Sequence, residues 1–563
     1  MSSSAPRRVV FVGIDGATWK IIEPLVQEGK LPNLAAMMEA GTRGILESTI
    51  PVNSSVAWAS FMTGCDAGKH GVFFFREQRH GSYQRPIIRF DSLQAPTLFR
   101  LASDHGLRVV SVTMPLTYPP EPVNGAMIGG LLTPDRDADF IHPPELRAEL
   151  QEAIGDVPAD NEPEKLFHAG DLDGALQSLH HVTEQVTRMA EHLLRTRDPD
   201  LLTVVFRGVD LVCHQALCAT DPEWARAHPE EARRFGHLVE DMYRRVDASL
   251  GRIRDLARRL AEEQGRELVL AVGSDHGFGQ LSYRYYLNKW LVDQGYLVLK
   301  PGAGSAGALR LWLQRKWTGL LRRTGILRRL HARGRALPKG PEQTYMEMVD
   351  WSRTRAWSSF SGGEDIILVN LRGREPEGIV EPGAEYEALR NEILERIKTL
   401  EAPDGTRIIA RAFRREELWQ GPQLEQAPDI QLVTLDTSCN MAASPVHPAT
   451  VERAWEGRPA MHALDGIYLF EAPGIVRPGE RQDGPRIADM GPTLLHLLGL
   501  PVEDYMDGEV LEDMLEPAWR AAHPIQVREG HVQLESRRRD SGEMSAEEEA
   551  KLLETMQALG YME

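Results

Sequence analysis

The sequence predicts an α/β fold in which a mostly parallel β-sheet is covered by helices on both faces. Short runs of β-branched and apolar residues, typical of buried parallel strands, occur at residues 8–14, 201–206 and 269–273. Amphipathic helical patterns lie between these runs, and the clearest of them covers residues 240–263. This alternation of strands and helices indicates the fold class.

Two of these strand runs end in a similar way. The first stops at Asp15-Gly16, and the third stops at Asp275-His276-Gly277. Open α/β sheets place their sites at the carboxyl edge of the parallel strands, where such side chains meet. Gly277 lets the backbone bend, so that Asp275 and His276 can both reach one ion. A solvated turn is the simpler alternative for so short a motif.

The bulk composition limits the class of protein. A chain of 563 residues can bury a large core, and 42% hydrophobic with 26% charged residues is ordinary for a soluble globular protein. The net charge of −18 means that the whole protein repels nucleic acid and anionic membranes, so an anionic substrate needs local positive charge, such as bound metal ions. The four scattered cysteines and the lack of a signal-peptide or membrane-spanning run predict a cytoplasmic protein with reduced thiols.

A pair of serines begins a helix rich in small residues. Ser54 and Ser55 follow a loop that starts at Pro51, and the helical pattern continues to Gly64. The N–H groups and the dipole at a helix N-terminus stabilise an anion such as an alkoxide. Either serine could equally act only as an N-cap. Around this segment we expect helices over residues 19–28 and 34–39 and strands over residues 44–49 and 106–113.

Further residues of the metal-ligand type follow two other strands. Asp210 and His214 come after the strand at 201–206 and, four residues apart, fall on one helical face. They could bind one metal, or form a surface pair. His462 precedes a strand that begins with glycine, so its imidazole could lie at the same edge of the sheet. Its alternative role is that of a hydrogen-bonded structural residue.

Three stretches differ from the strand and helix pattern, and we interpret them as insertions. Residues 136–195, 301–340 and 372–425 interrupt one catalytic domain over residues 1–534, which a charged tail and a C-terminal helix follow over residues 535–563. Residues 309–335 are basic and amphipathic and carry Trp312 and Trp317. This segment could make a peripheral membrane contact or clamp an anionic ligand, or it could be a cap helix with snorkelling arginines. In the last insertion we expect a helix over residues 386–400 and a strand over residues 407–411.

The order of these residues resembles the alkaline phosphatase superfamily, and within it the type I phosphodiesterase/nucleotide pyrophosphatase branch. The resemblance covers residues 8–80, 200–300 and 425–512. Residues 114–120, 370–378 and 498–507 look like a prokaryotic subgroup of predicted phosphohydrolases and phosphomutases. It implies an alkaline-phosphatase-like three-layer sandwich with a mostly parallel central sheet and capping insertions.

The resemblance also implies roles for individual residues. One metal would be held by Asp15, Asp275 and His276 and would contact the nucleophile, and the other by Asp210, His214 and His462. The nucleophile of the branch lies nine residues before the threonine of a Thr-Gly-x-x-Pro-x-x-His-Gly signature. Thr63-Gly64 and His70-Gly71 match this signature, which gives Ser54, with Ser55 as the alternative.

The chain departs from the signature at two places. Ala67 replaces the proline, and residues 72–75 read Val-Phe-Phe-Phe where nucleotide pyrophosphatases carry an asparagine that binds a phosphate oxygen. Asn53 and Arg207 are therefore the candidates for substrate binding. The sulfatase branch is disfavoured because its Cys/Ser-x-Pro-x-Arg motif is absent around Ser54.

We therefore expect a metal-dependent phosphoester hydrolase that acts on a small phosphorylated substrate through a phosphoseryl intermediate. Two divalent ions beside the serine would lower its pKa and stabilise the attacking and leaving oxygens. Ligands from Asp and His without thiolates suit Zn²⁺, with Mn²⁺ as the alternative. Two other functions stay open at this point: a phosphomutase or phosphotransferase that uses the same site, and a non-catalytic binding protein.

Overall fold

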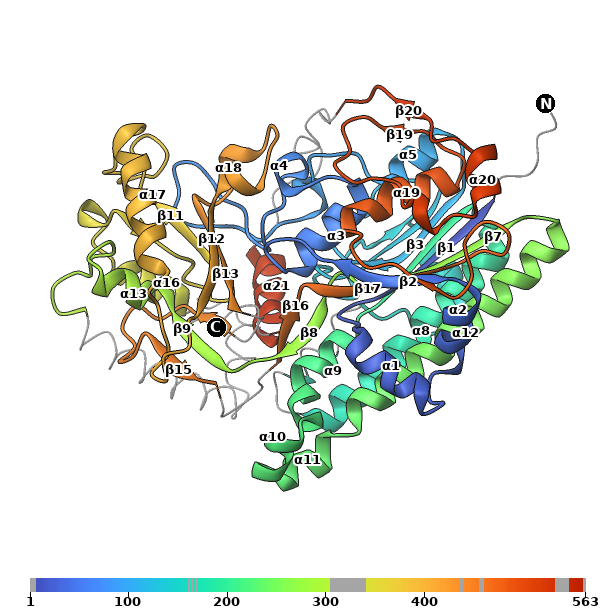
Figure 1. Cartoon of the computed structure of the whole chain (residues 1–563), viewed down its shortest axis with the longest axis horizontal. Helices are drawn as coiled ribbons and strands as arrows, with labels where there is room; N and C mark the ends of the chain where they lie inside the picture. The colour runs from blue at the N-terminus through green and yellow to red at the C-terminus, as the bar shows by residue number, and fades with distance from the viewer. Residues whose placement is uncertain are drawn as a thin grey trace.

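The computed structural model describes residues 7–159, 163, 166–167, 171–303, 341–435, 439–454, 460–531 and 546–559. Within these residues the largest sheet has nine strands in the order β18-β2-β17-β7-β1-β6-β3-β4-β5 (Figure 1). Its strands are β1 (Arg8–Ile14), β2 (Thr42–Glu47), β3 (Val109–Met114), β4 (Gly125–Gly129), β5 (Ile141–His142), β6 (Leu201–Phe206), β7 (Leu268–Gly273), β17 (Asp465–Glu471) and β18 (Glu480–Arg481).

The predicted fold class is confirmed. Strands β7, β1, β6, β3 and β4 run parallel, whereas β17 is antiparallel to β2 and β7, and β5 is antiparallel to β4. Strands β1 and β6 have the predicted bounds. The strand predicted at 44–49 lies at Thr42–Glu47, because Thr42 to Glu47 form the register with β17. The strand predicted from residue 106 begins at Val109, because Gly106 has a φ of +79° and belongs to the turn that ends α5.

Helices cover both faces of this sheet, which gives three layers (Figure 1). One face carries α1 (Trp19–Gln27), α2 (Pro32–Ala40), α8 (Leu172–Arg197) and α12 (Leu238–Gln264), and the other carries α3 (Ser54–Thr63), α5 (Leu98–Asp104) and α19 (Met490–Leu497). The stretch 136–195 contributes β5 at the sheet edge, α6 (Leu146–Ile154) and most of α8, whose buried face packs on β3, β6 and α12. The further helices outside the cap are α4 (Ala67–His70), α9 (Gly208–Ala216), α10 (Pro222–Ala227), α11 (Pro229–Phe235), α20 (Pro517–Ala522) and, near the C-terminus, α21 (Ala546–Leu559).

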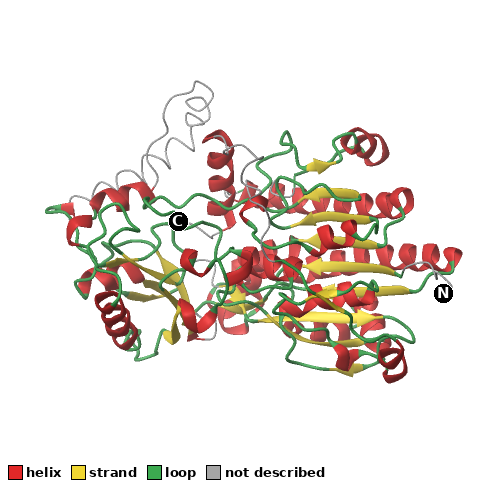
Figure 2. Ribbon diagram, turned by 90° about the horizontal axis from the view of Figure 1, so that it is seen from above, coloured by secondary structure: helices red, strands yellow, loops and turns green. Residues whose placement is uncertain are grey.

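A second hydrophobic core lies beside the sheet domain, and we call it the cap (Figure 2). Apart from Phe74, its core is built from residues 283–303 and 341–454, as far as the structure describes them. It contains α13 (Leu287–Asp293), α16 (Pro341–Met348), α17 (Ala384–Ile397) and two sheets, β10-β11-β13-β12 and β14-β9-β15. Their strands are β9 (Tyr283–Tyr286), β10 (Ala356–Trp357), β11 (Ile366–Val369), β12 (Ile409–Arg414), β13 (Ile430–Thr434), β14 (Cys439–Ala442) and β15 (Val451–Arg453).

The insertion predicted at 372–425 is part of this larger cap. Its expected helix and strand correspond to α17 and β12, each displaced by about two residues. Most of the stretch 301–340, including the basic segment 309–335, lies outside the described residues. Among the helices that the structure describes, none combines the length and the apolar character needed to cross a bilayer.

A loop of the sheet domain, residues 76–85, anchors the cap, and we call it the docking loop (Figure 1). Tyr83 stacks on Trp351 with 3.7 Å between ring centroids, and its hydroxyl donates to Asn370 Oδ1 at 2.8 Å. Asn370 is fully buried, and its Nδ2 donates to three backbone oxygens, those of Trp351, Thr354 and Glu377. The stretch 370–378, noted in the sequence, is therefore a turn that fastens the cap to the docking loop.

Replacing Asn370 by Ala should destabilise the cap by about 3 kcal/mol, because it leaves several buried carbonyl groups without a donor. Urea denaturation followed by tryptophan fluorescence measures this, since Trp351 and Trp357 report on the cap core. Tyr83→Phe is the milder control and should cost about 1 kcal/mol. An Asn370→Ala protein that unfolds at the same urea concentration as the native protein contradicts this account of the turn.

Candidate active site

Three adjacent strands bring the predicted acidic residues to one edge of the sheet. The register aligns the ends of β1 and its neighbours, since Ile14 lies opposite Phe206 and Gly13 lies opposite Gly273. Asp15 directly follows β1, Asp275 follows β7, and Asp210 lies in the first turn of α9, which follows β6. The three carboxylates are each 1% exposed. The sheet therefore builds the cluster that the strand ends predicted.

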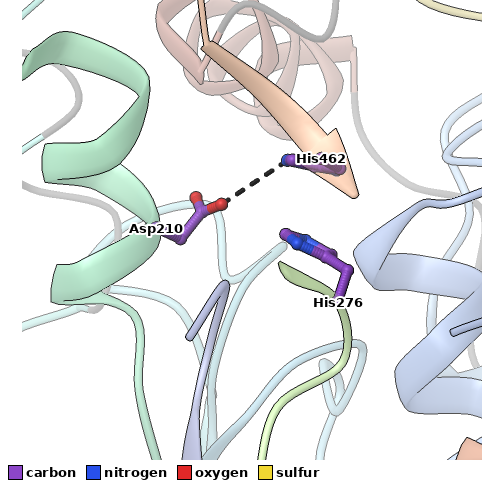
Figure 3. Close-up of side chains that lie close together, drawn as sticks. All are labelled: Asp210, His276 and His462. Atoms are coloured by element: carbon purple, nitrogen blue, oxygen red, sulfur yellow. Dashed lines mark ion pairs between the residues drawn. The ribbon is translucent and has the colours of Figure 1, made fainter. Parts of the chain in front are cut away.

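Two groups of possible metal ligands form at this edge. Asp15, Asp275 and His276 make one group, and Asp210, His276 and His462 make the other, with the ligand atoms of each group within 4.8 Å of one another. Figure 3 shows the second group, with the ion pair between Asp210 and His462 dashed. His276 Nε2 lies 3.2 Å from Asp275 Oδ2 and 3.8 Å from Asp15 Oδ1.

Two histidines face Asp210: His214 from the same helix, α9, and His462 from a distant strand. Asp210 Oδ1 lies 3.4 Å from His214 Nε2 and 3.5 Å from His462 Nε2, and the two Nε2 atoms are 2.9 Å apart. His462 lies on β16 (Ala460–Ala463), which pairs with β8 (Gly277–Gln280) so that His462 is opposite Phe278. This long-range strand pairing brings His462 over the His276 ring, with the centroids 3.6 Å apart. All six predicted ligand residues are therefore brought together.

Burial and the neighbouring charges set the electrostatics of this cluster. Burial, then the charges of Asp275 and Asp210, raise the pKa of Asp15 well above its usual value. Burial and Asp210 raise the pKa of Asp275 to about 7. Burial opposes the ionisation of Asp210 as well, but His214 and His462 outweigh it and hold the pKa of Asp210 well below its usual value. Burial lowers the pKa of His462 to about 3, which favours the neutral imidazole that binds metals.

The residues present fit divalent cations. Asp15 Oδ1, Asp210 Oδ1 and Asp275 Oδ2 are buried and accept no hydrogen bond from the part of the chain that the structure describes. Buried carboxylate oxygens normally have a partner, and a group of three without one is costly in a protein interior. Carboxylates and neutral imidazoles, with no cysteine in either group found among the described residues, are a donor set that zinc and manganese accept.

Ser54, rather than Ser55, faces this cluster. Ser54 Oγ lies 3.1 Å from His276 Nε2 and is 1% exposed. Ser55 is engaged elsewhere, because its Oγ donates to Asn53 Oδ1 at 2.5 Å and its N–H donates to the same oxygen at 3.0 Å. Asn53 is thus the N-cap of α3, and neither serine has that role.

The His-Gly part of the signature holds α3 in place. His70 is fully buried, its Nε2 lies 3.1 Å from Ser60 Oγ on α3, and its Nδ1 accepts the N–H of Val72 at 3.1 Å. Gly64 ends α3 with a φ of +65°, a backbone conformation that favours glycine. The signature therefore sets the position of the helix that carries Ser54.

The two candidates for substrate binding lie beside the cluster. Arg207 is the N-cap of α9 and is buried, and its positive charge acts on Asp15 by lowering the pKa of that carboxyl. Asn53 is also buried, next to Ser54. Sequence reasoning missed Trp58, whose indole Nε1 donates to Asp15 Oδ2 at 3.1 Å. The signal was its place on the helix, four residues after Ser54.

Adding Zn²⁺ or Mn²⁺ to protein stripped by a chelator should raise its thermal midpoint. At a free metal concentration 1,000 times Kd the gain is about 4 kcal/mol. Asp275→Asn keeps an acceptor for the N–H of Gly16, which the native Oδ1 receives at 3.1 Å, but removes a charge. The stripped variant should therefore be more stable than the stripped native protein and gain less from metal. Equal gains in both proteins contradict a cation at this site.

Comparison with solved structures finds the same fold in two enzymes named for phosphorus chemistry. Phosphonoacetate hydrolase from Sinorhizobium meliloti 1021, in complex with phosphonoacetate, has a TM-score of 0.54 at 15% identity, over 88% of this chain and 96% of that chain. Murine ectonucleotide pyrophosphatase/phosphodiesterase 5, in complex with AMP, has a TM-score of 0.50 at 13% identity, over 91% of this chain and 100% of that chain. At these identities the likeness shows the fold alone.

No curated protein is significantly similar to the chain. The family described as type I phosphodiesterase/nucleotide pyrophosphatase matches residues 9–438, which include the strands β1, β6 and β7 and the residues that follow them. The match covers well over half of the sequence and agrees with the fold and with the resemblance of the site motifs. It favours an enzyme over a non-catalytic binding protein. The chain belongs to the type I phosphodiesterase/nucleotide pyrophosphatase family, and it is a hydrolase that acts on phosphoric ester bonds.

Proposed function

We propose that the chain is a two-metal phosphoester hydrolase in which Ser54 forms a phosphoseryl intermediate. The observation that carries this proposal is the position of Ser54 Oγ, 3.1 Å from His276 Nε2 at the edge of a buried Asp/His cluster. A serine hydroxyl that served only the fold would have no need of such neighbours. The substrate is a small phosphorylated molecule. The two structural neighbours are in complex with small ligands that contain phosphorus, the phosphate ester AMP and the phosphonate phosphonoacetate.

The ligand residues divide into two sets. Asp15, Asp275 and His276 would hold one ion, because His276 Nε2 lies 3.2 Å from Asp275 Oδ2. The other ion would be held by Asp210, His214 and His462, since the Nε2 atoms of both histidines face Asp210 Oδ1. The ions are Zn²⁺ or, alternatively, Mn²⁺. When bound, two such ions lower the pKa of a serine hydroxyl and stabilise negative charge on the attacking and leaving oxygens.

The chain's own groups then position and exchange the phosphoryl group. Ser54 Oγ gives its proton to solvent water and forms a bond to phosphorus, while the bond from phosphorus to the leaving oxygen breaks and that oxygen keeps the electron pair. The positive end of the α3 dipole and the Arg207 guanidinium favour the anionic phosphoryl oxygens beside Ser54. Asn53 would donate from Nδ2 to one of these oxygens, with Oδ1 retained by Ser55. Water then cleaves the Oγ–P bond and restores the hydroxyl.

Ser54→Ala should lower the hydrolysis of bis-p-nitrophenyl phosphate by the metal-loaded enzyme at least about 1,000-fold, because no nucleophile remains. Ser55→Ala is the matched control on the neighbouring residue and should retain activity within about tenfold, since it loses only the hydrogen bond from its Oγ to Asn53 Oδ1 and keeps the capping N–H. Acid quenching of native enzyme followed by mass spectrometry should find phosphate on Ser54. An active Ser54→Ala enzyme, or phosphate on Ser55, contradicts the assignment.

The cap favours a second candidate function, transfer of the phosphoryl group to an alcohol. A separate core over residues 283–303 and 341–454 stands beside the sheet domain, and exclusion of water by such a cap would favour transfer over hydrolysis. The product of the reaction distinguishes the hydrolase from the phosphotransferase. Transfer between sugar phosphates without release of inorganic phosphate supports a phosphomutase or phosphotransferase, and stoichiometric phosphate release supports the hydrolase.

A further inference from the structure

Helix α3 contacts the cluster at a second point besides Ser54. Trp58 lies one helical turn further along, on the same face of the helix. Its Nε1 donates to Asp15 Oδ2 at 3.1 Å, and both side chains are 1% exposed. One helix therefore delivers the nucleophile and also binds one of the carboxylates that face it.

The indole of Trp58 is held over strand β1 by the residues that precede Asp15. Phe11 and Gly13 are two residues apart and therefore lie on the same face of the strand. A Cβ atom on Gly13 would lie 2.8 Å from Cη2 of Trp58, so that only glycine leaves room for the ring. Phe11 and Phe61 pack edge-on against the indole, with centroids 6.3 and 5.4 Å away. The ring has little freedom to turn its N–H away from Asp15.

This contact leaves the other oxygen of Asp15 for the cluster. Oδ1 accepts no hydrogen bond within the described residues and lies 3.8 Å from His276 Nε2. Asp275 repeats the arrangement, because its Oδ1 receives the N–H of Gly16 while Oδ2 is left 3.2 Å from His276 Nε2. Packing alone does not require such a contact. Trp357 is just as buried, and its Nε1 finds no acceptor within the described residues.

We propose that Trp58 is a positioning residue, which fixes the Asp15 carboxylate so that Oδ1 is presented to the cation held with Asp275 and His276. Because Ser54 is on the same helix, the contact also sets the separation between the nucleophile and this cation site. The inference rests on the proposed function for the presence of the cation. Groups that orient metal ligands in this way change metal affinity by 10- to 100-fold when they are lost.

The test is a metal titration of Trp58→Phe, with Trp357→Phe as the matched control. Both variants replace a buried indole by a phenyl ring, but only the first removes a hydrogen bond to the cluster. Competition of the full-length proteins with a chromophoric chelator for Zn²⁺ resolves the two binding steps. We expect about 10- to 100-fold weaker binding in one step for Trp58→Phe and an unchanged second step, with both steps native in Trp357→Phe.

A second variant tests whether the position of the indole, and not only its presence, determines the metal affinity. Gly13→Ala retains the indole N–H but displaces the ring, and it should weaken the same single step. Native affinities in both steps of Trp58→Phe overturn the positioning role, and so does equal weakening of both steps. A native protein that binds no divalent ion overturns the proposed function itself, a result that is distinguishable because it appears before any substitution is made.

Discussion

The crowding of three ionisable carboxylates into one buried site is the constraint on which this structure depends. Asp15, Asp210 and Asp275 are almost completely buried at the ends of neighbouring strands. Burying such charges without a partner is strongly unfavourable, and buried carboxylates are normally compensated by a positive charge such as a bound cation. The buried carboxylates lower the stability of the folded protein at the carboxyl edge of the sheet. Divalent ions that bind there would stabilise the folded state. The pKa values of Asp15 and Asp275 are raised for the same reason, because burial and neighbouring carboxylates disfavour the charged form.

The elements around the cluster orient its ligands. Each of two carboxylates has one oxygen held by an N–H group, from Trp58 or from Gly16, and the other oxygen directed to the cluster. His276 Nδ1 lies 3.0 Å from the carbonyl oxygen of Gly277, which leaves Nε2 facing the carboxylates. The groups that orient the ligand side chains are therefore as precisely placed as the ligands themselves. The cap, fastened through Asn370 and Tyr83, stands beside this edge of the sheet and has a second hydrophobic core.

Much of the sheet and of the ligand set could be predicted from the sequence, because both depend on local pattern. Buried parallel strands are continuous apolar runs, so β1 and β6 were identified to the residue, and the side chains that follow them converge by topology. The choice between Ser54 and Ser55 could not be made from capping preference, because either could cap a helix. Only the structure gives the cap to Asn53.

The extent of the cap and the role of Trp58 were beyond sequence reasoning for a different reason. The cap core joins segments such as β9 and α17 that are about a hundred residues apart, and such long-range packing leaves little local pattern. The Trp58 contact needs a glycine on β1 and an indole on α3 to meet, and neither pattern predicts the other. The membrane or anion contact suggested by residues 309–335 stays a prediction, as does the cytoplasmic location.

Anomalous X-ray diffraction from crystals soaked with Zn²⁺ and vanadate tests the central claim most directly. The account predicts two anomalous peaks, one within bonding distance of Asp15, Asp275 and His276 and one within bonding distance of Asp210, His214 and His462, with vanadate bonded to Ser54 Oγ between them. Vanadate bonded to another residue, or an absence of metal from these carboxylates at full soaking, would contradict it.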